Sequence, residues 1–279
     1  MSLHLHPYQP RAHPFEKPAF IMEADGETVS FGKLEARANQ GANALRTHGI
    51  NRGDHIAILM ENRREMLEVC FAADRAGVYY TTISTHLNVD EIAYIVADCG
   101  ARLLIASDRF LEILPGVASK RKDHCEIMVV GDAAGLYPCW STEAAQHKET
   151  PIVDEAQGLD MLYSSGTTGR PKGIKWPLKN TLPGARTMLV DLLSSLFGYG
   201  PHARYLCPAP LYHAAPLRHA MVTIKMGGTA VIMDRFDAER ALHLIESYKI
   251  THSQWVPTMF VRLLRLPEDV RTRYDLSSM

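Results

Sequence analysis

Apolar residues along the first half of the chain recur with two alternating periods. From Leu34 to Leu45 they return at steps of three and four residues, which predicts the buried face of a helix. Ser30 stands where an N-cap belongs, and Gly49 stands where a helix-ending glycine belongs. Residues 55–60 then form a short, mainly aliphatic run, which predicts a strand.

The same alternation continues to residue 130. Asn88 followed by Glu91 resembles a capping box and predicts the start of a helix, and Gly77 and Gly100 stand at predicted helix ends. Further helices are predicted around residues 66–73 and 89–99, and further strands at residues 78–83, 102–106 and 126–130. Strand–helix–strand alternation with short connections predicts a mainly parallel sheet covered by helices.

The second half begins with a polar, poorly periodic stretch, residues 133–158, which contains Pro138 and Pro151. This pattern predicts a long surface connection. Strands are then predicted at residues 159–163, 205–207, 229–233 and 251–255, and helices after Asp237 and from Pro257. The predicted fold class is therefore α/β, with mainly parallel sheets flanked by helices.

Composition narrows the class of protein. Hydrophobic residues make up 46% of the 279 residues and charged residues 22%, which is typical of a globular chain with a sizeable core. Lys and Arg number 30 against 31 Asp and Glu, a net charge of -1, so the chain has no global field to gather nucleic acid or anionic lipid. We therefore expect no nucleic-acid partner, and any anion site must be local.

The cysteines and the N-terminal residues indicate a compartment. The five cysteines include no C-x-x-C pair, which predicts a reducing compartment and no metal cluster. Residues 1–17 lack the apolar core of a signal peptide, and His4 and His6 fit a metal site less well than a solvated terminus. The apolar runs 188–197 and 221–233 are too short to cross a bilayer. We therefore expect a cytoplasmic protein without a transmembrane segment.

One segment, Tyr163 to Gly173, stands apart in composition. Its sequence is Tyr-Ser-Ser-Gly-Thr-Thr-Gly-Arg-Pro-Lys-Gly, which combines Ser and Thr hydroxyls, glycines and two cations. Glycines let the backbone take positive φ and approach a ligand closely, and successive N–H groups can form an anion-binding nest. Lys172 adds a compact charge suited to phosphate. The segment therefore favours a polyphosphate cradle.

Two alternatives to a polyphosphate cradle need weighing. A Walker A loop needs Gly-Lys-Ser/Thr after a four-residue gap, whereas here Pro171 precedes Lys172 and Gly173 follows it, which disfavours an ordinary P-loop NTPase. Gly, Ser, Thr and Pro also form ordinary solvated turns. On composition alone, the cradle and the turn stay equally open.

The segment resembles the signature loop of the adenylate-forming superfamily, which includes acyl-CoA synthetases, luciferases and peptide-synthetase adenylation domains. Residues 209–216, Ala-Pro-Leu-Tyr-His-Ala-Ala-Pro, resemble the family's second core motif. Residues 31–54, 91–105 and 275–278 resemble other family segments, so the resemblance covers essentially the whole chain. The chain is thus similar to the N-terminal part of an AMP-forming acyl-CoA synthetase, that is, a fatty-acid CoA ligase.

The resemblance implies a two-step reaction, in which a carboxylate joins the α-phosphate of ATP and the acyl group then passes to a thiol. It implies ATP, Mg²⁺ and CoA as cofactors, a small-molecule carboxylic acid as substrate, and Lys172 as a catalytic residue. The implied ATP-binding residues are Ser164, Ser165, Gly166, Thr167, Thr168, Gly169 and Lys172. Ser165 matches a loop position that reaches the metal, although neighbouring hydroxyls are chemically equivalent.

His213 is the second implied catalytic residue. A histidine in an apolar stretch is more often structural, but the resemblance places this one between the nucleotide and acyl sites, where a neutral imidazole can donate to an oxygen. Tyr212 and Trp255 are the other implied acyl-pocket residues, and ordinary core packing is slightly favoured for Trp255. The apolar surroundings of His213 favour a hydrophobic acid.

The family's later motifs do not occur in the sequence, among them the glutamate that helps hold Mg²⁺ and the C-terminal lid domain. We therefore expect residues 1–279 to be an incomplete N-terminal adenylation domain, inactive alone, with unpaired strand edges and apolar helix faces. Two alternatives stay open, namely a non-catalytic nucleotide- or acyl-binding module and an interaction domain that binds no nucleotide. The chain length of the acid and homo-oligomerisation are also open.

Overall fold

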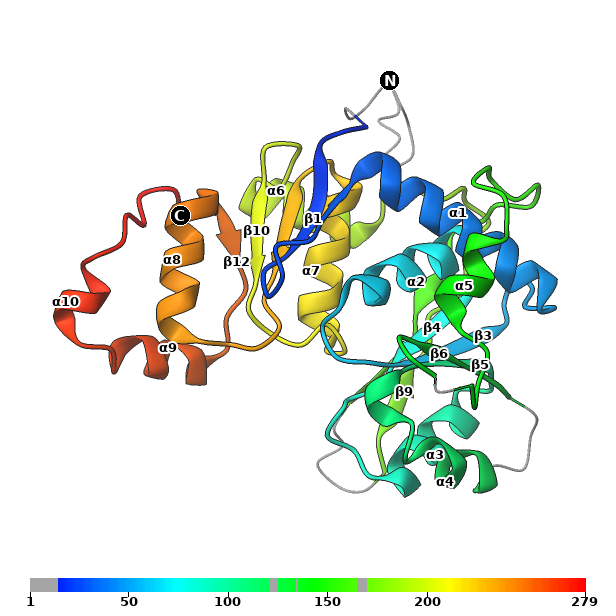
Figure 1. Cartoon of the computed structure of the whole chain (residues 1–279). Coiled ribbons are helices and arrows are strands. Elements are labelled where there is room, and N and C mark those ends of the chain that lie inside the picture. Colours follow the sequence, from blue (N-terminus) through cyan, green and yellow to red (C-terminus); the bar gives the residue numbers. More distant parts are fainter. Residues whose placement is uncertain (1–14, 121–124, 134, 165–169) are drawn as a thin grey trace. The chain divides into compact units, whose positions relative to one another are not determined.

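The chain folds as two compact units, each built around its own five-stranded sheet (Figure 1). We call them unit 1, residues 1–33 and 184–279, and unit 2, residues 34–183. The structure is a computed structural model, and it describes residues 15–120, 125–133, 135–164 and 170–279.

The sheet of unit 2 is parallel, with the strand order β6-β5-β3-β4-β7. Its strands are β3 (His55–Leu59), β4 (Tyr79–Thr82), β5 (Ala101–Ser107), β6 (Glu126–Val130) and β7 (Leu159–Asp160). The helices are α1 (Phe31–Thr47, which begins in unit 1), α2 (Arg64–Arg75), α3 (Val89–Asp98), η1 (Asp108–Phe110), α4 (Leu114–Ser119) and α5 (Trp140–Ala145). The predicted α/β class, with mainly parallel sheets flanked by helices, is confirmed.

Helices cover both faces of this sheet. Ala57, Leu104 and Val129 belong to a buried cluster that also contains residues of α3 and α4. Successive side chains of a strand point to opposite faces, so Ile58 and Ile105, which are fully buried as well, face the other side. Among its described residues, this cluster contains none from α2 or α5. Helix α2 contacts β4 and α5 contacts β6. Burial on both faces explains why these strands are almost continuously apolar.

Two predicted helix starts are confirmed. Ahead of α1, the Ser30 hydroxyl accepts a hydrogen bond from the Lys33 backbone N–H at 3.3 Å. Ahead of α3, Asn88 and Glu91 form the reciprocal capping box, with both hydrogen bonds present. Gly100, just past the end of α3, has a φ of +68°, a conformation that favours glycine.

The sheet of unit 1 has the order β12-β10-β11-β1-β2, and only its β1–β2 pair is antiparallel. Its strands are β1 (Pro18–Met22), β2 (Thr28–Ser30), β10 (Arg204–Cys207), β11 (Thr229–Ile232) and β12 (His252–Ser253). The helices are α6 (Met188–Phe197), α7 (Ala214–Lys225), α8 (Ala238–Tyr248), α9 (Pro257–Leu264) and α10 (Glu268–Arg271).

Helices α7 and α8 lie on opposite faces of this sheet (Figure 1). Ala241 and Leu244 of α8 share a buried cluster with Leu206 and Val231 of the sheet. Helix α7 contacts β10 and β11 from the side that this cluster does not occupy. The sheet therefore places the start of α7 beside the ends of β10 and β11.

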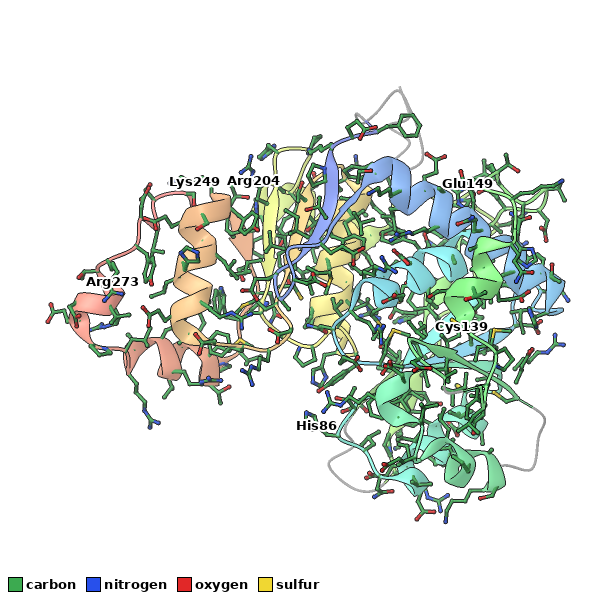
Figure 2. The ribbon with its side chains drawn as sticks, in the orientation of Figure 1. His86, Cys139, Glu149, Arg204, Lys249 and Arg273 are labelled. Atoms are coloured by element: carbon green, nitrogen blue, oxygen red, sulfur yellow. The ribbon has the colours of Figure 1, made fainter. Side chains whose placement is uncertain are left out.

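The last residues of the chain fold back on α8 through charged side chains. Lys249, just past α8, forms an ion pair with Asp275 at 3.0 Å, and Arg273 pairs with Glu239 of α8 at 3.1 Å. Figure 2 labels Lys249 and Arg273. Such exposed pairs stabilise weakly, by about 0–1 kcal/mol each. The sequence analysis expected unpaired strand edges and apolar helix faces. In unit 1, β12 forms one edge of the sheet, and the apolar side chain of Leu264 in α9 is 69% exposed.

The predicted strand over residues 159–163 is wrong as a single element. β7 pairs in parallel with β4 in the main sheet, whereas β8 (Leu162–Ser164) pairs antiparallel with β9 (Lys172–Ile174) in a separate two-stranded sheet. The change occurs at Met161, whose N–H donates to Tyr80 O and whose C=O accepts from the Thr81 hydroxyl. These bonds hold Met161 against β4 while the chain turns away after it.

Two further predictions need correction. The predicted strand 251–255 is shorter, since only His252 and Ser253 pair with β10. Residues 133–158 are more than a surface connection, because they contain α5, where Trp140 is only 4% exposed. Trp140 packs closely over Gly41 of α1, where an added Cβ would lie 3.3 Å from the indole.

The sequence analysis also made predictions about membrane-spanning helices and about the cysteines. Among the residues that the structure describes, no helix is both long enough and apolar enough to cross a membrane. The five cysteines are free thiols, and four of them are buried, while Cys139 is half-buried. Lys17, the last residue of the predicted solvated terminus, donates hydrogen bonds to Pro201 O and Gly227 O, each at 2.6 Å.

Gly158, just before β7, lies very close to the backbone of neighbouring residues, and this close approach can be tested. A Cβ at this position would lie 2.5 Å from both Ala73 O and Val78 O, and backbone carbonyls cannot move aside cheaply. Gly158→Ala should therefore lower the free energy of unfolding by about 3 kcal/mol. Gly53→Ala is the control, because Gly53 has open space but a φ of +88°, so its cost should be about 1 kcal/mol.

Urea denaturation of both variants measures this difference. Equal destabilisation of the two would contradict the close backbone approach at Gly158.

Candidate phosphate-binding hairpin and acid-binding segment

The predicted phosphate-binding segment is a β-hairpin in unit 2. β8 and β9 pair antiparallel, with Leu162 opposite Ile174 and Ser164 opposite Lys172. Ser164 and Lys172, both exposed, thus face each other at the loop end of the hairpin. The structure brings these two predicted site residues together.

The remaining residues of the predicted loop lie outside the described part of the chain. They are Ser165, Gly166, Thr167, Thr168 and Gly169. Their predicted roles in ATP binding, and that of Ser165 in binding Mg²⁺, stay predictions. Within the described ranges, no group of three or more His, Cys, Asp or Glu side chains is placed to hold a metal ion.

Gly173 has a role that the sequence analysis did not identify. It pairs with Tyr163, and a Cβ at Gly173 would lie 2.8 Å from the Tyr163 ring and 2.5 Å from the Met161 methyl. Gly173 is not among the glycines with positive φ. The position therefore requires glycine because the Tyr163 ring lies across it, not because of its backbone conformation.

Helix α3 contacts the hairpin on both sides of its loop end, next to Ser164 and Lys172. The Tyr163 hydroxyl donates to Asp98 Oδ2 at 2.5 Å, and the Tyr94 hydroxyl contacts Pro171 O at 3.2 Å. Burial, together with the hydrogen bond to Asp98, raises the pKa of Tyr163 well above its usual range. The phenol is therefore protonated at neutral pH and acts as the donor.

The cations after the loop differ in their surroundings. The Arg170 side chain is exposed, and its guanidinium lies 5.1 Å from the centre of the Tyr94 ring. Lys175 Nζ lies 2.9 Å from His55 Nε2 and 4.5 Å from the centre of the Tyr79 ring. Burial, and then the Lys175 charge, lower the pKa of His55 to about 4, so neutral His55 accepts from Lys175.

Lys172 is a cation of the hairpin that is available to a ligand. Its side chain is exposed and forms no hydrogen bond, ion pair or ring contact with any described residue. The side chain therefore stands in solvent at the open end of the hairpin. An anion could approach it without breaking an existing contact with the described residues.

The second predicted group, Tyr212 and His213, lies in unit 1 directly before α7. Tyr212 is 7% exposed, His213 is exposed, and their ring centres are 4.5 Å apart. His213 is the N-cap residue of α7, with extended backbone and no side-chain capping bond. Its imidazole is therefore presented at the end of the helix where backbone N–H groups favour negative charge.

Trp255 is half-buried and packs against neighbouring aromatic rings and the core of unit 1. Its ring centre lies 5.8 Å from that of Phe236 and 6.0 Å from that of Phe260, and it packs against the buried cluster of α8. These contacts account for its position without a ligand. Its predicted role in the acyl pocket stays a prediction. The hairpin belongs to unit 2, whereas Tyr212, His213 and Trp255 belong to unit 1.

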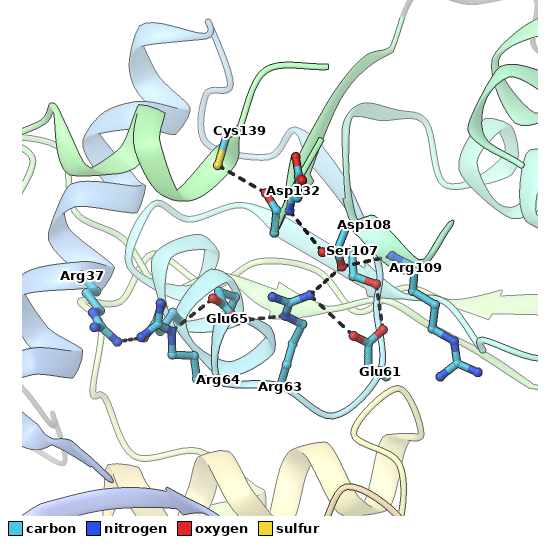
Figure 3. Close-up of polar contacts among 12 residues, drawn as sticks. Arg37, Glu61, Arg63, Arg64, Glu65, Ser107, Asp108, Arg109, Asp132 and Cys139 are labelled. Atoms are coloured by element: carbon cyan, nitrogen blue, oxygen red, sulfur yellow. Dashed lines mark hydrogen bonds and ion pairs between the residues drawn. The ribbon is translucent and has the colours of Figure 1, made fainter. Parts of the chain in front are cut away.

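A network of charges at the carboxyl end of the unit 2 sheet was missed by the sequence analysis (Figure 3). Arg63 contacts Glu65 at 2.9 Å, Asp108 at 3.3 Å and Glu61 at 3.5 Å, and the Ser107 hydroxyl donates to Glu61 at 2.7 Å. Burial raises the pKa of Glu65, but the charge and hydrogen bond of Arg63 outweigh it and lower the pKa.

This network lies where ligands often bind in open parallel sheets, beyond the strand ends at a change in strand order, here β3 and β5. Its cations and anions pair with one another, so the geometry explains it as an ion-pair network that ties β3, α2 and β5 together. No sequence motif marks these residues, because they meet only after the strands have paired.

Comparison with known proteins identifies the family. The profile of AMP-binding enzymes matches residues 7–279. The chain is 29% identical to 4-coumarate–CoA ligase 5 of Oryza sativa subsp. japonica, covering 100% of this chain and 51% of that protein. It is 32% identical to a feruloyl-CoA synthase of Amycolatopsis, covering 91% of this chain and 48% of that protein. The chain thus spans about half the length of these curated relatives.

Solved structures agree with this assignment. ATP-bound MatB from Rhodopseudomonas palustris superposes with a TM-score of 0.77 at 25% identity, over 98% of this chain and 54% of MatB. An anthranilate CoA ligase in complex with anthranoyl-AMP superposes with a TM-score of 0.79 at 24% identity, over 96% of this chain and 52% of the ligase, and supports the fold. The predicted resemblance to adenylate-forming CoA ligases is confirmed, and the chain belongs to the AMP-binding enzyme family.

Proposed function

We propose that this chain forms the nucleotide- and acid-binding part of an ATP-dependent, AMP-forming CoA ligase. The observation that supports this most strongly is the exposed Lys172, opposite Ser164 at the open end of the β8–β9 hairpin. Family membership and the names of the relatives, which are CoA ligases and a CoA synthase, favour the same activity. Residues 1–279 would be part of an N-terminal adenylation domain in a cytoplasmic enzyme.

In the first proposed step, a carboxylate oxygen attacks the α-phosphorus of ATP. The bond from that phosphorus to the bridging oxygen breaks, and pyrophosphate leaves. Both reactants are anions, so catalysis requires charge neutralisation and alignment. Lys172 supplies a cation to the terminal phosphates, and Ser164 supplies a hydroxyl donor. Mg²⁺ is proposed at Ser165, outside the described residues, and would neutralise further phosphate charge.

In the second proposed step, the thiol of CoA loses its proton to solvent and its sulfur attacks the acyl carbon of the acyl-adenylate. AMP leaves with the electrons of the broken C–O bond. His213 is proposed to donate a hydrogen bond to an oxygen of the acid or of the α-phosphate. Tyr212 would pack against the acid beside it. The exposed position of His213 at the start of α7 suits both roles.

The proposed substrate is a hydrophobic carboxylic acid. The names of two relatives, 4-coumarate–CoA ligase and feruloyl-CoA synthase, put aromatic acids first among the candidates. Fatty acids come next, since the residues around His213 are apolar and include small side chains. The proposed inactivity of the 279-residue chain by itself follows from the family motifs that its sequence lacks.

Acid-dependent exchange of labelled pyrophosphate into ATP tests this function. The assay compares the full protein encoded by the gene with the 279-residue chain, using 4-coumarate, ferulate, benzoate and hexadecanoate. We expect exchange from the full protein with at least one acid, and Mg·ATP binding without exchange from the chain alone. Binding without exchange in both would favour a non-catalytic binding module, and no Mg·ATP binding by either would contradict the nucleotide role.

A further inference from the structure

Two side chains of α3 reach both strands of the β8–β9 hairpin. Asp98, the last residue of α3, accepts the hydrogen bond from the Tyr163 hydroxyl of β8. Tyr94, one turn earlier, contacts Pro171 O at 3.2 Å through its hydroxyl, just before β9 begins. The same hydroxyl lies 3.4 Å from Asp98 Oδ1, so the two anchors also contact each other.

Helix α3 is a firm support for these anchors. Its first turn is closed by a complete capping box, and its residues Ile92, Ile95 and Val96 are almost fully buried in the cluster beneath the sheet. A side chain on a packed and capped helix keeps its position better than one on a loop. Through Asp98 and Tyr94, the hairpin is therefore held in a fixed position on the core of unit 2.

The anchored residues adjoin the ligand-facing ones. Tyr163 directly precedes Ser164, and Pro171 directly precedes Lys172. A slip of one residue in the β8–β9 register would turn the Ser164 and Lys172 side chains to opposite faces. The Tyr163 ring across Gly173 fixes the register, while the bonds to Asp98 and Tyr94 fix where the paired strands stand on α3.

We propose that Asp98 and Tyr94 are positioning residues that hold Ser164 and Lys172 at the separation needed to bind the terminal phosphates of ATP. This inference rests on the proposed function and deepens it. Neither residue contacts the phosphates itself. Each acts through a hydrogen bond to a residue that adjoins a phosphate-binding one.

Single-group substitutions in the 279-residue chain test the proposal. Tyr163→Phe and Tyr94→Phe each delete one hydroxyl, and Asp98→Asn removes a charge with little change in shape. Loss of one such hydrogen bond should weaken Mg·ATP binding about 3- to 10-fold, measured by titration calorimetry. Tyr137→Phe is the matched control, because Tyr137 packs against the same hydrophobic cluster but forms no hydrogen bond with the described residues of the hairpin. It should bind Mg·ATP like the unmodified chain.

Trypsin cleavage after Lys172 gives a readout that needs no nucleotide. Arg170 is followed by proline, which blocks trypsin there, so cleavage within the hairpin reports on Lys172. We expect faster cleavage in the three variants than in Tyr137→Phe. Combining Tyr163→Phe with Asp98→Asn should weaken binding about as much as Tyr163→Phe alone, since Tyr163→Phe already removes the hydrogen bond that Asp98→Asn weakens.

The possible results separate the two proposals. Weaker Mg·ATP binding with faster cleavage supports the positioning role. Unchanged binding in the variants, whether cleavage or stability changes or not, overturns it and leaves Asp98 and Tyr94 as structural anchors. An unmodified chain that does not bind Mg·ATP overturns the proposed function and the positioning role together.

Discussion

Replacing Lys172 with alanine is expected to weaken Mg·ATP binding by about 10- to 100-fold. A hydrogen bond between charged groups contributes about 1.5–3 kcal/mol. The Lys172 side chain makes no contact with the described residues, so its removal affects only the interaction with the phosphates. For the same reason its removal should leave folding nearly unchanged. Titration calorimetry of the variant measures the affinity, and urea denaturation measures the stability.

Lys148→Ala provides the control for this change. Lys148 is also an exposed lysine of unit 2 but lies in the connection after α5, outside the hairpin. Its removal changes the net charge equally and should leave Mg·ATP affinity within about twofold, since exposed charges at a distance are screened. Equal loss of affinity in both variants would mean that only net charge matters, and the hairpin assignment would be wrong.

His213→Ala in the full protein is expected to lower the rate of acid-dependent pyrophosphate exchange by about 100-fold. Losing one donor to the charge that develops on a reacting oxygen typically costs that much. The effect on folding should be small, because the imidazole is exposed and does not cap α7. Exchange at saturating ATP and acid separates this loss from weaker binding.

His202→Ala controls for removing a histidine from the same unit. His202 is exposed and lies before β10, away from α7 in sequence. We expect exchange close to that of the unmodified protein. Unimpaired exchange in His213→Ala with every acid tested would argue against the proposed role of His213.

Short-range rules are enough to predict several elements of the fold. The caps at Ser30 and Asn88 depend on side chains that bond to backbone three residues away, so the pattern alone identifies them. The buried strands of unit 2 are evident from their aliphatic runs. The parallel arrangement follows from the alternation of strands with helices.

Elements that depend on distant partners were not predicted. β1 forms because Phe20 and its neighbours pair with β11, which lies about 200 residues later in the chain. Helix α6 coincides with the apolar run 188–197 and α7 overlaps the run 221–233, and in such runs periodicity does not separate buried helix from strand. Helix α5 is too short for a periodic pattern, and the burial of Trp140 depends on its contact with α1.

In the candidate site, too, features that depend on neighbouring residues were predicted and features that depend on distant partners were not. The composition of residues 163–173, with the family resemblance, is enough to select Lys172 and Ser164. Their pairing across a hairpin was not predicted, because the pattern of residues 159–163 favours one continuous strand. Asp98 and Tyr94 were not selected at all, since they meet Tyr163 and Pro171 only through contacts 65 and 77 residues apart in sequence.

A crystal structure of the chain with bound Mg·ATP would test the central claim most directly. We expect terminal phosphate oxygens about 3 Å from Lys172 Nζ and within reach of the Ser164 hydroxyl, at the open end of the β8–β9 hairpin. A triphosphate bound at another place in the chain, with Lys172 left in solvent, would contradict the claim.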